Sequence, residues 1–328
     1  MLLAAAVTAC GGDTPSMLAP RSDDARRVEG LWWVLFWISC AVVAVVTGFL
    51  LAAARRRRAE LHSGDETDED DIDRRPVPWG DRFVVIAGAA IPGGILAGSF
   101  AFSLAVLNDM GSTDDRPLEV EVVGHTWWWE VRYPNGAVTA NEIRIPVGET
   151  VRLGLPTADV IHSFWVPELQ VKKDQIPGAD NQLSVVADHA GRFRGQCAEF
   201  CGLQHAHMEI LVVAMAPDEF DNWVEREAEP AAEPVGAEAE DGRQIFERAS
   251  CAGCHTITGT SAEGVLGPDL THLADRETLG AGVVRLTPES LAAFITDPQD
   301  DKPGVSMPPT ELTPDQVDAV VAYLMELE

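Results

Sequence analysis

Two long runs without a charged residue constrain this 328-residue chain more than any other feature. They span residues 30–54 and 83–108. Each run is long enough to cross a bilayer, which takes about 20 predominantly apolar residues. The sequence therefore predicts a membrane protein with a two-helix transmembrane hairpin at residues 30–108. The chain that follows is long enough for two further domains.

The basic residues around the hairpin predict its orientation. The connecting loop, residues 55–82, contains seven arginines, four of them in the run 55–58. Cytoplasmic loops of membrane proteins carry an excess of lysine and arginine. The loop is therefore expected in the cytoplasm of a bacterial cell, with both termini and the later domains on the extracytoplasmic side.

The overall charge excludes one class of function. Aspartate and glutamate number 52 against 24 lysines and arginines, which gives a formal net charge of −28. A general nucleic-acid binder must neutralise phosphates with basic side chains. No nucleic-acid partner is therefore expected.

The first 29 residues contain a possible processing signal. A short apolar stretch ends in small residues just before Cys10. This pattern resembles the lipobox of bacterial lipoproteins, in which that cysteine becomes the lipidated first residue. The usual positive start of a signal peptide is missing, so a chance apolar start is the alternative. Cleavage before Cys10 would agree with an N-terminus outside the cytoplasm.

The hydrophobic pattern changes to alternation between residues 115 and 223. Valine and isoleucine alternate with polar residues in five short segments, with Gly, Pro and Asn between them. Alternation over four to eight residues is typical of half-buried β-strands. The sequence predicts an all-β domain of short antiparallel strands, a sandwich or barrel, with strands near 118–123, 142–146, 150–155, 182–186 and 210–214.

One loop of this domain concentrates metal-binding side chains. It contains Cys197, Cys201, His205 and Met208 in the sequence C-A-E-F-C-G-L-Q-H-A-H-M, and His162 lies upstream in H-S-F-W-V-P. Two thiols, two imidazoles and a thioether suit copper better than calcium or magnesium. Zinc would accept the cysteines and histidines without needing the methionine. A disulfide between the cysteines is a further alternative, against which the added histidine and methionine argue.

These motifs resemble the CuA domain of cytochrome c oxidase subunit II. That family has a cupredoxin fold behind a two-helix membrane hairpin, and the resemblance covers about residues 28–223. It implies two coppers that share the bridging thiolates, so that one electron is spread over both metals on a rigid β-scaffold. The implied ligands are His162, Cys197, the backbone carbonyl of Glu199, Cys201, His205 and Met208.

The same resemblance implies further roles. The side chain of Glu199 would reach a magnesium ion shared with the catalytic subunit. Trp127, in G-H-T-W-W-W, would be the electron entry point, although the family usually has Gln at Thr126 and large aromatics in a strand are more often core residues. Many members have an acid near the start of the second membrane helix. This chain has Val85 there, so no proton-channel role is transferred.

A second redox motif follows a linker. Residues 224–240 are rich in Glu, Ala and Pro, which predicts an extended linker. After it, Cys251 and Cys254 stand in C-A-G-C-H, the attachment motif of c-type haem. The two thiols would bond covalently to the haem, and His255 would become an axial ligand of the iron.

The last part of the chain resembles class I cytochrome c over about residues 239–328. The resemblance implies an all-α domain at 241–328 with Met307, in V-S-M-P-P, as the second axial ligand. A methionine–histidine pair raises the haem potential, which suits a donor to copper. Thr287 before Pro288 and Thr313 before Pro314 are typical helix starts, with threonine as the cap and proline in the first turn.

The order of these parts is similar to subunit II of a caa3-type cytochrome c oxidase. The resemblance implies that cytochrome c or quinol–cytochrome c reductase reduces the haem, and that electrons then pass through copper to catalytic subunit I, where oxygen is reduced. The chain would be an oxidoreductase subunit without an oxygen-reducing site of its own. Cys40, in the first membrane helix, is interpreted as an apolar packing residue.

Two alternatives remain at this point. The first is a copper-handling membrane protein with a fused cytochrome c, against which Met208 and the haem motif argue. The second is a non-enzymatic interaction subunit with degenerate metal sites, as in quinol oxidases. The complete set of copper ligands argues against the second.

Overall fold

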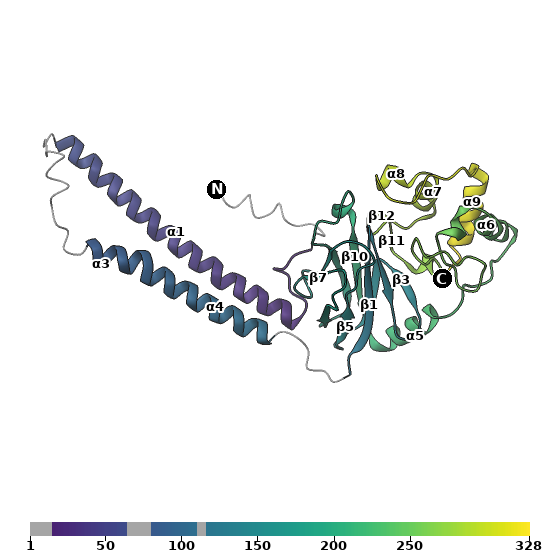
Figure 1. Cartoon of the computed structure of the whole chain (residues 1–328), viewed down its shortest axis with the longest axis horizontal. Helices are drawn as coiled ribbons and strands as arrows, with labels where there is room; N and C mark the ends of the chain where they lie inside the picture. The colour runs from purple at the N-terminus through teal and green to yellow at the C-terminus, as the bar shows by residue number, and fades with distance from the viewer. Residues whose placement is uncertain (1–14, 64–79, 110–115) are drawn as a thin grey trace. The chain divides into compact units, whose positions relative to one another are not determined.

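The computed structural model describes residues 15–63, 80–109 and 116–328 (Figure 1). The chain divides into two compact units, one formed by residues 27–110 and the other by residues 1–26 together with 111–328. The predicted lipidation at Cys10 and most of the loop 55–82 lie outside the described residues.

The smaller unit is a helical hairpin. Helix α1 is Asp23–Ser63, and the returning segment consists of α3 (Gly80–Val85), the π-helix η2 (Ile86–Ala90) and α4 (Ile91–Asp109). The mean hydropathy reaches 2.5 within 23–59 and 1.8 within 86–108, so both helices are long and apolar enough to cross a membrane. The rings of Phe49 and Phe83 lie 5.8 Å apart, which links the two arms.

Helix α1 is longer than the apolar run at 30–54. It begins after Ser22, whose hydroxyl accepts a hydrogen bond from the backbone N–H of Ala25. Such a cap stabilises the first turn. At the other end the helix continues through the arginine run at 55–58 because alanine and arginine are good helix formers.

Proline explains the π-helix in the second arm. Pro92 has no backbone N–H, so the carbonyl of Gly88 has no partner in the usual α-helical pattern. The preceding turn widens, and the N–H of Ile91 bonds to the carbonyl of Ile86. Val85 ends α3 just before this turn and is exposed.

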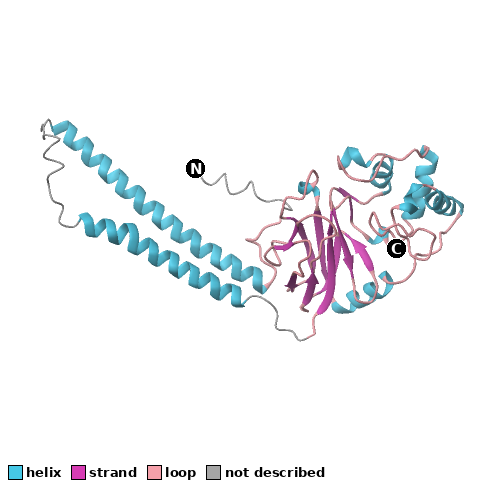
Figure 2. Cartoon of the chain, in the orientation of Figure 1, coloured by secondary structure: helices cyan, strands magenta, loops and turns pink. Residues whose placement is uncertain are grey.

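The larger unit begins with a β-sandwich of two five-stranded sheets (Figure 2). The first sheet has the order β3-β2-β1-β5-β8, and the second has β4-β10-β9-β6-β7. The strands are β1 (Leu118–His125), β2 (Trp128–Arg132), β3 (Val138–Ala140), β4 (Glu142–Pro146), β5 (Val151–Gly154), β6 (His162–Trp165), β7 (Lys173–Gln175), β8 (Gln182–Val185), β9 (Gly191–Cys197) and β10 (Glu209–Met215). The five predicted strands agree with β1, β4, β5, β8 and β10 to within two residues.

The prediction of purely antiparallel strands was wrong in two places. Strand β1 pairs in parallel with β5, and β10 pairs in parallel with β4. Alternation in a single segment reports which face is buried, but it does not report the direction of the neighbouring strand. The remaining strand pairs of the sandwich are antiparallel.

The core between the sheets reaches the predicted metal loop. Along β9, Phe193, Gly195 and Cys197 are buried while Arg194 and Gln196 are exposed, because residues on one face of a strand recur every second position. Trp129 is fully buried, and its ring lies 6.0 Å from the rings of His162 and Phe164. The core therefore fixes the strands that end in metal-ligand candidates.

The linker is shorter than the predicted range 224–240. Helix α5 (Pro217–Glu227) packs Phe220 and Trp223 on the sandwich, and α6 starts at Ala237, so only residues 228–236 lie outside helices. Glutamate and alanine are good helix formers, and a composition rich in them does not separate a linker from a helix. The intervening segment is not free, since the N–H of Ala231 bonds to the carbonyl of Thr258.

The C-terminal part is helical, as predicted, and also has a short β-hairpin. Its elements are α6 (Ala237–Arg248), η4 (Ser250–Gly253), η5 (Leu273–Asp275), β11 (Thr278–Leu279), β12 (Val284–Arg285), α7 (Pro288–Thr296), α8 (Pro298–Asp301) and α9 (Pro314–Leu324). Both predicted helix starts are confirmed as capping boxes, with Thr287 capping α7 and Thr313 capping α9.

Helices α6 and α9 pack at very close range. A Cβ atom on Gly242 would lie 1.9 Å from the backbone oxygen of Ala319, so the crossing of these helices requires glycine. The rings of Phe246 and Tyr323 meet beside it, 6.2 Å apart. This contact anchors the helix that leads into the haem motif.

Candidate metal and haem sites

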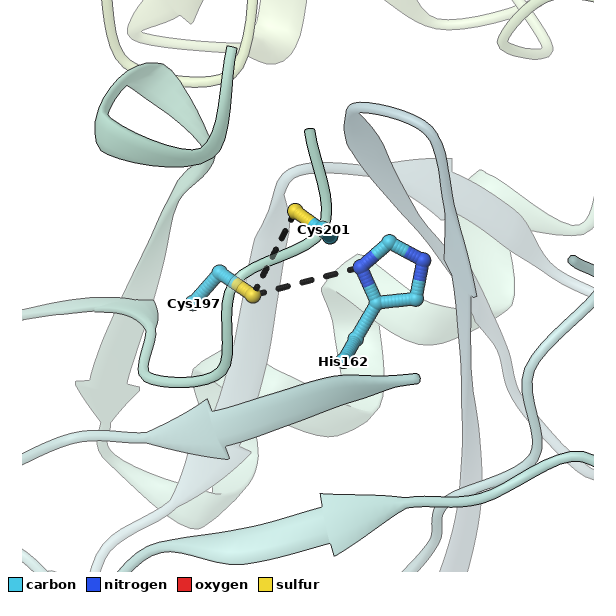
Figure 3. Close-up of side chains that lie close together, drawn as sticks. All are labelled: His162, Cys197 and Cys201. Carbon is cyan, nitrogen blue, oxygen red and sulfur yellow. Dashed lines mark hydrogen bonds between the residues drawn. The ribbon is translucent and has the colours of Figure 1, made fainter. Parts of the chain in front are cut away.

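Three predicted ligands meet at one end of the sandwich (Figure 3). Sγ of Cys197 lies 3.8 Å from Sγ of Cys201 and 3.9 Å from Nδ1 of His162. The ligand atoms of all three residues lie within 4.8 Å of one another. Both cysteines are free. A disulfide requires sulfurs about 2.05 Å apart, so the structure does not support the disulfide alternative.

The other predicted copper ligands surround the same two sulfurs. Nδ1 of His205 is 3.7 Å and Sδ of Met208 is 3.8 Å from Sγ of Cys201. On the other side, the backbone oxygen of Glu199 is 3.2 Å from Sγ of Cys197. The structure therefore brings together all six donors that the sequence nominates for copper.

Backbone pairing explains why these donors converge. His162 begins β6 and Cys197 ends β9, and the two strands pair antiparallel with Phe164 opposite Cys197. The loop then closes on itself, because the N–H of Cys197 bonds to the carbonyl of Met208 over 2.9 Å. Both ends of the loop are thus attached to sheet strands, which limits movement of the side chains between them.

One functional residue was missed by sequence reasoning. Asp159 accepts a hydrogen bond from Nε2 of His162 over 2.8 Å, and its other oxygen accepts bonds from the backbone N–H and the hydroxyl of Thr126. A carboxylate on one ring nitrogen orients the other nitrogen toward a metal. The signal was present in T-A-D-V-I-H, where an acid precedes the histidine by three residues.

The two thiols differ strongly in acidity. The pKa of Cys197 lies far below its ordinary range, mainly because of its hydrogen bond with Cys201, and His162 lowers it further against the effect of burial. The pKa of Cys201 is raised by the same hydrogen bond and by burial. The pair therefore holds one proton that a metal ion would have to displace.

The donor set fits a metal ion held between the two sulfurs. Thiolate sulfur binds first-row metal ions at about 2.3 Å, so one ion can contact both sulfurs if they are less than about 4.6 Å apart. The separation here is 3.8 Å. His162, Cys197 and Met208 are buried, which keeps water away from part of the site. Two thiolates, two imidazoles and a thioether are ligands that suit copper.

The remaining predicted residues near this site have other contacts. Trp127 lies in the turn between β1 and β2, and its Nε1 donates to the carbonyl of Cys201 over 2.9 Å. The carboxylate of Glu199, proposed for magnesium, pairs with Nζ of Lys172 over 3.3 Å. Trp127 therefore touches the copper loop directly, whereas Glu199 turns its carboxylate toward a lysine.

The haem motif forms a compact turn after α6. The backbone N–H groups of Cys254 and His255 both bond to the carbonyl of Cys251, so the three residues lie close together. Nδ1 of His255 lies 2.7 Å from the carbonyl of Pro268, and burial lowers the pKa of this histidine. A neutral ring bonded through Nδ1 presents Nε2, which fits ligation of a haem iron.

Met307 lies in a loop whose backbone makes three hydrogen bonds with the side chain of Gln299. The amide of Gln299 donates to the carbonyls of Val305 and Met307 over 2.9 and 3.0 Å, and its oxygen accepts from the N–H of Gly304. Gly264 borders Cys254 and Gly267 borders His255, so the exposed apolar side chains of Val265 and Leu266 lie near the haem motif, where they would give a porphyrin apolar contacts. These features fit a c-type haem.

Comparisons with known proteins point to one family. Models for the periplasmic domain of cytochrome c oxidase subunit II and for cytochrome c match residues 136–215 and 239–328. The chain is 38% identical to cytochrome c oxidase subunit 2 of Alkalihalophilus pseudofirmus, over 98% of this chain and 94% of the relative. It is 36% identical to the same subunit of Bacillus sp. (strain PS3), over 69% of this chain and 67% of the relative.

One solved structure is also similar to part of the chain. The periplasmic domain of subunit II of the cytochrome oxidase of Bradyrhizobium japonicum is 33% identical, with a TM-score of 0.34, over 36% of this chain and 96% of that chain. The relative from A. pseudofirmus covers the membrane hairpin, the β-domain and the haem domain together. The two matched families imply copper and haem c. The chain therefore belongs to the cytochrome c oxidase subunit II family, as an electron-transfer subunit with a fused C-terminal cytochrome c domain.

Proposed function

We propose that the β-domain holds a binuclear CuA centre. Its ligands are His162, Cys197, the carbonyl of Glu199, Cys201, His205 and Met208. The observation that carries this proposal is the continuous set of contacts, none longer than 3.9 Å, that links the donor atoms of all six residues through the two sulfurs.

The C-terminal domain would hold a c-type haem. Cys251 and Cys254 would bond to it covalently, and His255 and Met307 would be the axial ligands. When bound, the copper pair and the haem supply one-electron redox chemistry. The chain's own residues keep the ligands fixed: Asp159 orients His162, and Gln299 holds the backbone around Met307. A fixed ligand geometry favours electron transfer because little has to rearrange.

The partners follow from this role. Electrons would come from cytochrome c or a quinol–cytochrome c reductase and would leave to catalytic subunit I of a haem-copper oxidase, where oxygen is reduced. Glu199 would also reach a magnesium ion shared with that subunit, after release of Lys172. Both redox domains would lie on the extracytoplasmic side of a bacterial membrane, in agreement with the seven arginines of the loop 55–82.

Metal analysis of the full chain tests the proposal. The protein would be purified in detergent after expression with haem maturation and copper loading. We expect two coppers and one iron per chain, and we expect Cys197→Ser to lose copper but keep its haem. Met325→Leu, which changes a methionine elsewhere in the chain, is the control and should keep both. One copper or none beside an intact haem would instead favour a copper-handling protein.

A further inference from the structure

A buried lysine joins the two redox domains. Lys302 is one of three lysines in the chain, and it is only 2% exposed. Its Nζ donates hydrogen bonds to the carbonyls of Trp127 over 2.7 Å, His207 over 3.0 Å and Gly280 over 2.6 Å. The first two carbonyls belong to the β-domain and the third to the haem domain. The three N–H groups of the ammonium thus each have an acceptor.

The acceptors in the β-domain lie beside copper-ligand candidates. His207 stands between His205 and Met208 in the ligand loop. Trp127 contacts that loop through its indole, which donates to the carbonyl of Cys201. Lys302 therefore holds two segments that border the proposed copper site.

Lys302 also begins the segment that leads to Met307. The next residue, Pro303, accepts a hydrogen bond from the side-chain amide of Gln204, which is again in the copper-ligand loop. Gln299 fixes the rest of the segment through the N–H of Gly304 and the carbonyl of Met307. Only four residues, 303–306, thus separate Lys302 from Met307, the proposed axial ligand of the haem.

Contacts away from the ligand loop hold the same two domains together. The carboxylate of Glu142 on β4 accepts hydrogen bonds from the backbone N–H groups of Glu277 and Thr278 over 2.7 and 3.0 Å. The N–H of Glu209 on β10 bonds to the carbonyl of Ala281 over 3.0 Å. The backbone of the short β11–β12 hairpin is therefore attached to the edge of the sandwich.

Burial of this lysine indicates a specific role. Burial lowers the pKa of Lys302 to about 7, and three carbonyl acceptors favour its charged form. A buried amine is costly and is retained only where its hydrogen bonds are all satisfied. A neutral apolar residue here would leave three carbonyls without their donor, and an unsatisfied buried group of this kind destabilises the contact it belongs to.

We propose that Lys302 is a positioning residue that keeps the Met307 segment of the haem domain docked on the copper-ligand loop for electron transfer within one chain. The proposal rests on the function proposed above. One electron leaves the reduced haem domain, which is oxidised, and the copper domain is reduced by that electron. The external donor then needs to meet only the haem domain, because the transfer from haem to copper takes place across the contact that Lys302 holds.

Hydrogen exchange of the full chain tests docking independently of the cofactors. Peptides that span 204–212 and 275–283 contain backbone N–H groups that bond across the contact between the domains. Hydrogen exchange at these groups reports how often the domains separate. We expect Lys302→Met to speed exchange in both peptides by about tenfold or more, the effect of about 1.4 kcal/mol. Lys173→Met, on a strand of the β-domain, is the matched control and should leave exchange unchanged. Hydrogen exchange at the wild-type rate in the Lys302→Met variant would overturn the proposal that Lys302 holds the two domains together.

Electron transfer tests the positioning role in the loaded protein. After rapid photoreduction of the haem domain at pH 6, we expect electron exchange in Lys302→Met to be at least about tenfold slower, with unchanged copper and haem spectra. If that variant does not load both cofactors, Gln204→Ala is tested in its place. It removes the hydrogen bond to the carbonyl of Pro303 and should also slow electron exchange between haem and copper. A wild-type rate in a loaded variant would overturn the proposal. Wild-type protein without a copper pair would overturn the proposed function. Hydrogen exchange would still show whether Lys302 holds the two domains together, because it does not depend on the cofactors.

Discussion

The carboxylate of Asp159 lies 2.8 Å from Nε2 of His162, on the side of the ring opposite the thiols. Nδ1 of the same ring faces Sγ of Cys197 over 3.9 Å. The aspartate thereby decides which nitrogen is available to a metal. The same carboxylate is held by Thr126, next to Trp127, so the orientation of His162 depends on the turn between β1 and β2.

Removing this carboxylate should weaken copper binding. Loss of a partner that orients a metal-bound histidine commonly costs about 10- to 100-fold in metal affinity. We expect Asp159→Ala to lower copper affinity by that factor in a competition titration against a chelator. Asp180→Ala, an exposed acid of the same domain, should bind copper as the wild type does. Equal affinities for the two variants would contradict the role of Asp159.

Glu227 should make stability fall as the pH rises. Burial raises the pKa of this carboxyl from 4.5 to about 7, although Arg276, His272 and Arg144 act in the opposite direction. Below pH 4.5 the group is protonated in both folded and unfolded chains. Between pH 4.5 and 7 only the unfolded chain releases the proton. The free energy of unfolding therefore falls over this range by about 3 kcal/mol, at 1.36 kcal/mol per pH unit.

Denaturant unfolding at several pH values checks this expectation. We expect Glu227→Gln to lose the decline in apparent unfolding midpoint between pH 4.5 and 7. Glu225→Gln, on the exposed side of the same helix α5, should keep the wild-type profile. A Glu227 variant whose profile matches the wild type would show that this carboxyl is not the group responsible.

Gly242→Ala should disrupt the haem domain. The added Cβ would meet the backbone oxygen of Ala319 at 1.9 Å, and backbone atoms cannot move aside as a flexible side chain does. Overpacking of this kind costs about 1–3 kcal/mol and occasionally more. We expect a lower thermal midpoint and less haem incorporation, measured against Asp241→Ala as an exposed control on the same helix. Normal haem content at the wild-type midpoint would refute the close crossing of α6 and α9.

Substitution of Met307 should lower the haem potential. A methionine opposite a histidine raises the potential relative to other axial pairs. In a potentiometric titration we therefore expect Met307→His to shift the midpoint of the haem to a lower value while the two cysteines still hold it covalently. Met215→Leu, at the end of β10, should leave that midpoint unchanged. An unchanged potential in the Met307 variant would mean that another residue ligates the iron.

Local patterns made much of the copper site predictable. Cys197, Cys201, His205 and Met208 fall within a stretch of twelve residues, and the structure places their donor atoms together. The helix starts at Thr287 and Thr313 were also predictable, since a cap and its partner are three residues apart.

Features that depend on distant segments were not predictable. Lys302 and Trp127 are 175 residues apart, and only the docking of two domains makes them neighbours. Parallel pairing of β1 with β5 likewise depends on the path of the chain between them, which alternation in a single strand does not record. The bond from the N–H of Ala231, in the linker segment 228–236, to the carbonyl of Thr258 also joins residues that only the folded haem domain brings together.

Electron paramagnetic resonance of the full, copper-loaded chain would show directly whether the two cysteines hold two coppers. We expect two coppers for each iron and a copper signal whose hyperfine structure shows one unpaired electron shared equally by two copper nuclei. We also expect Cys197→Ser and Cys201→Ser each to abolish that shared signal. A signal from a single copper nucleus in the wild-type chain, with one copper for each iron, would contradict the binuclear site built from His162, the two cysteines, His205 and Met208.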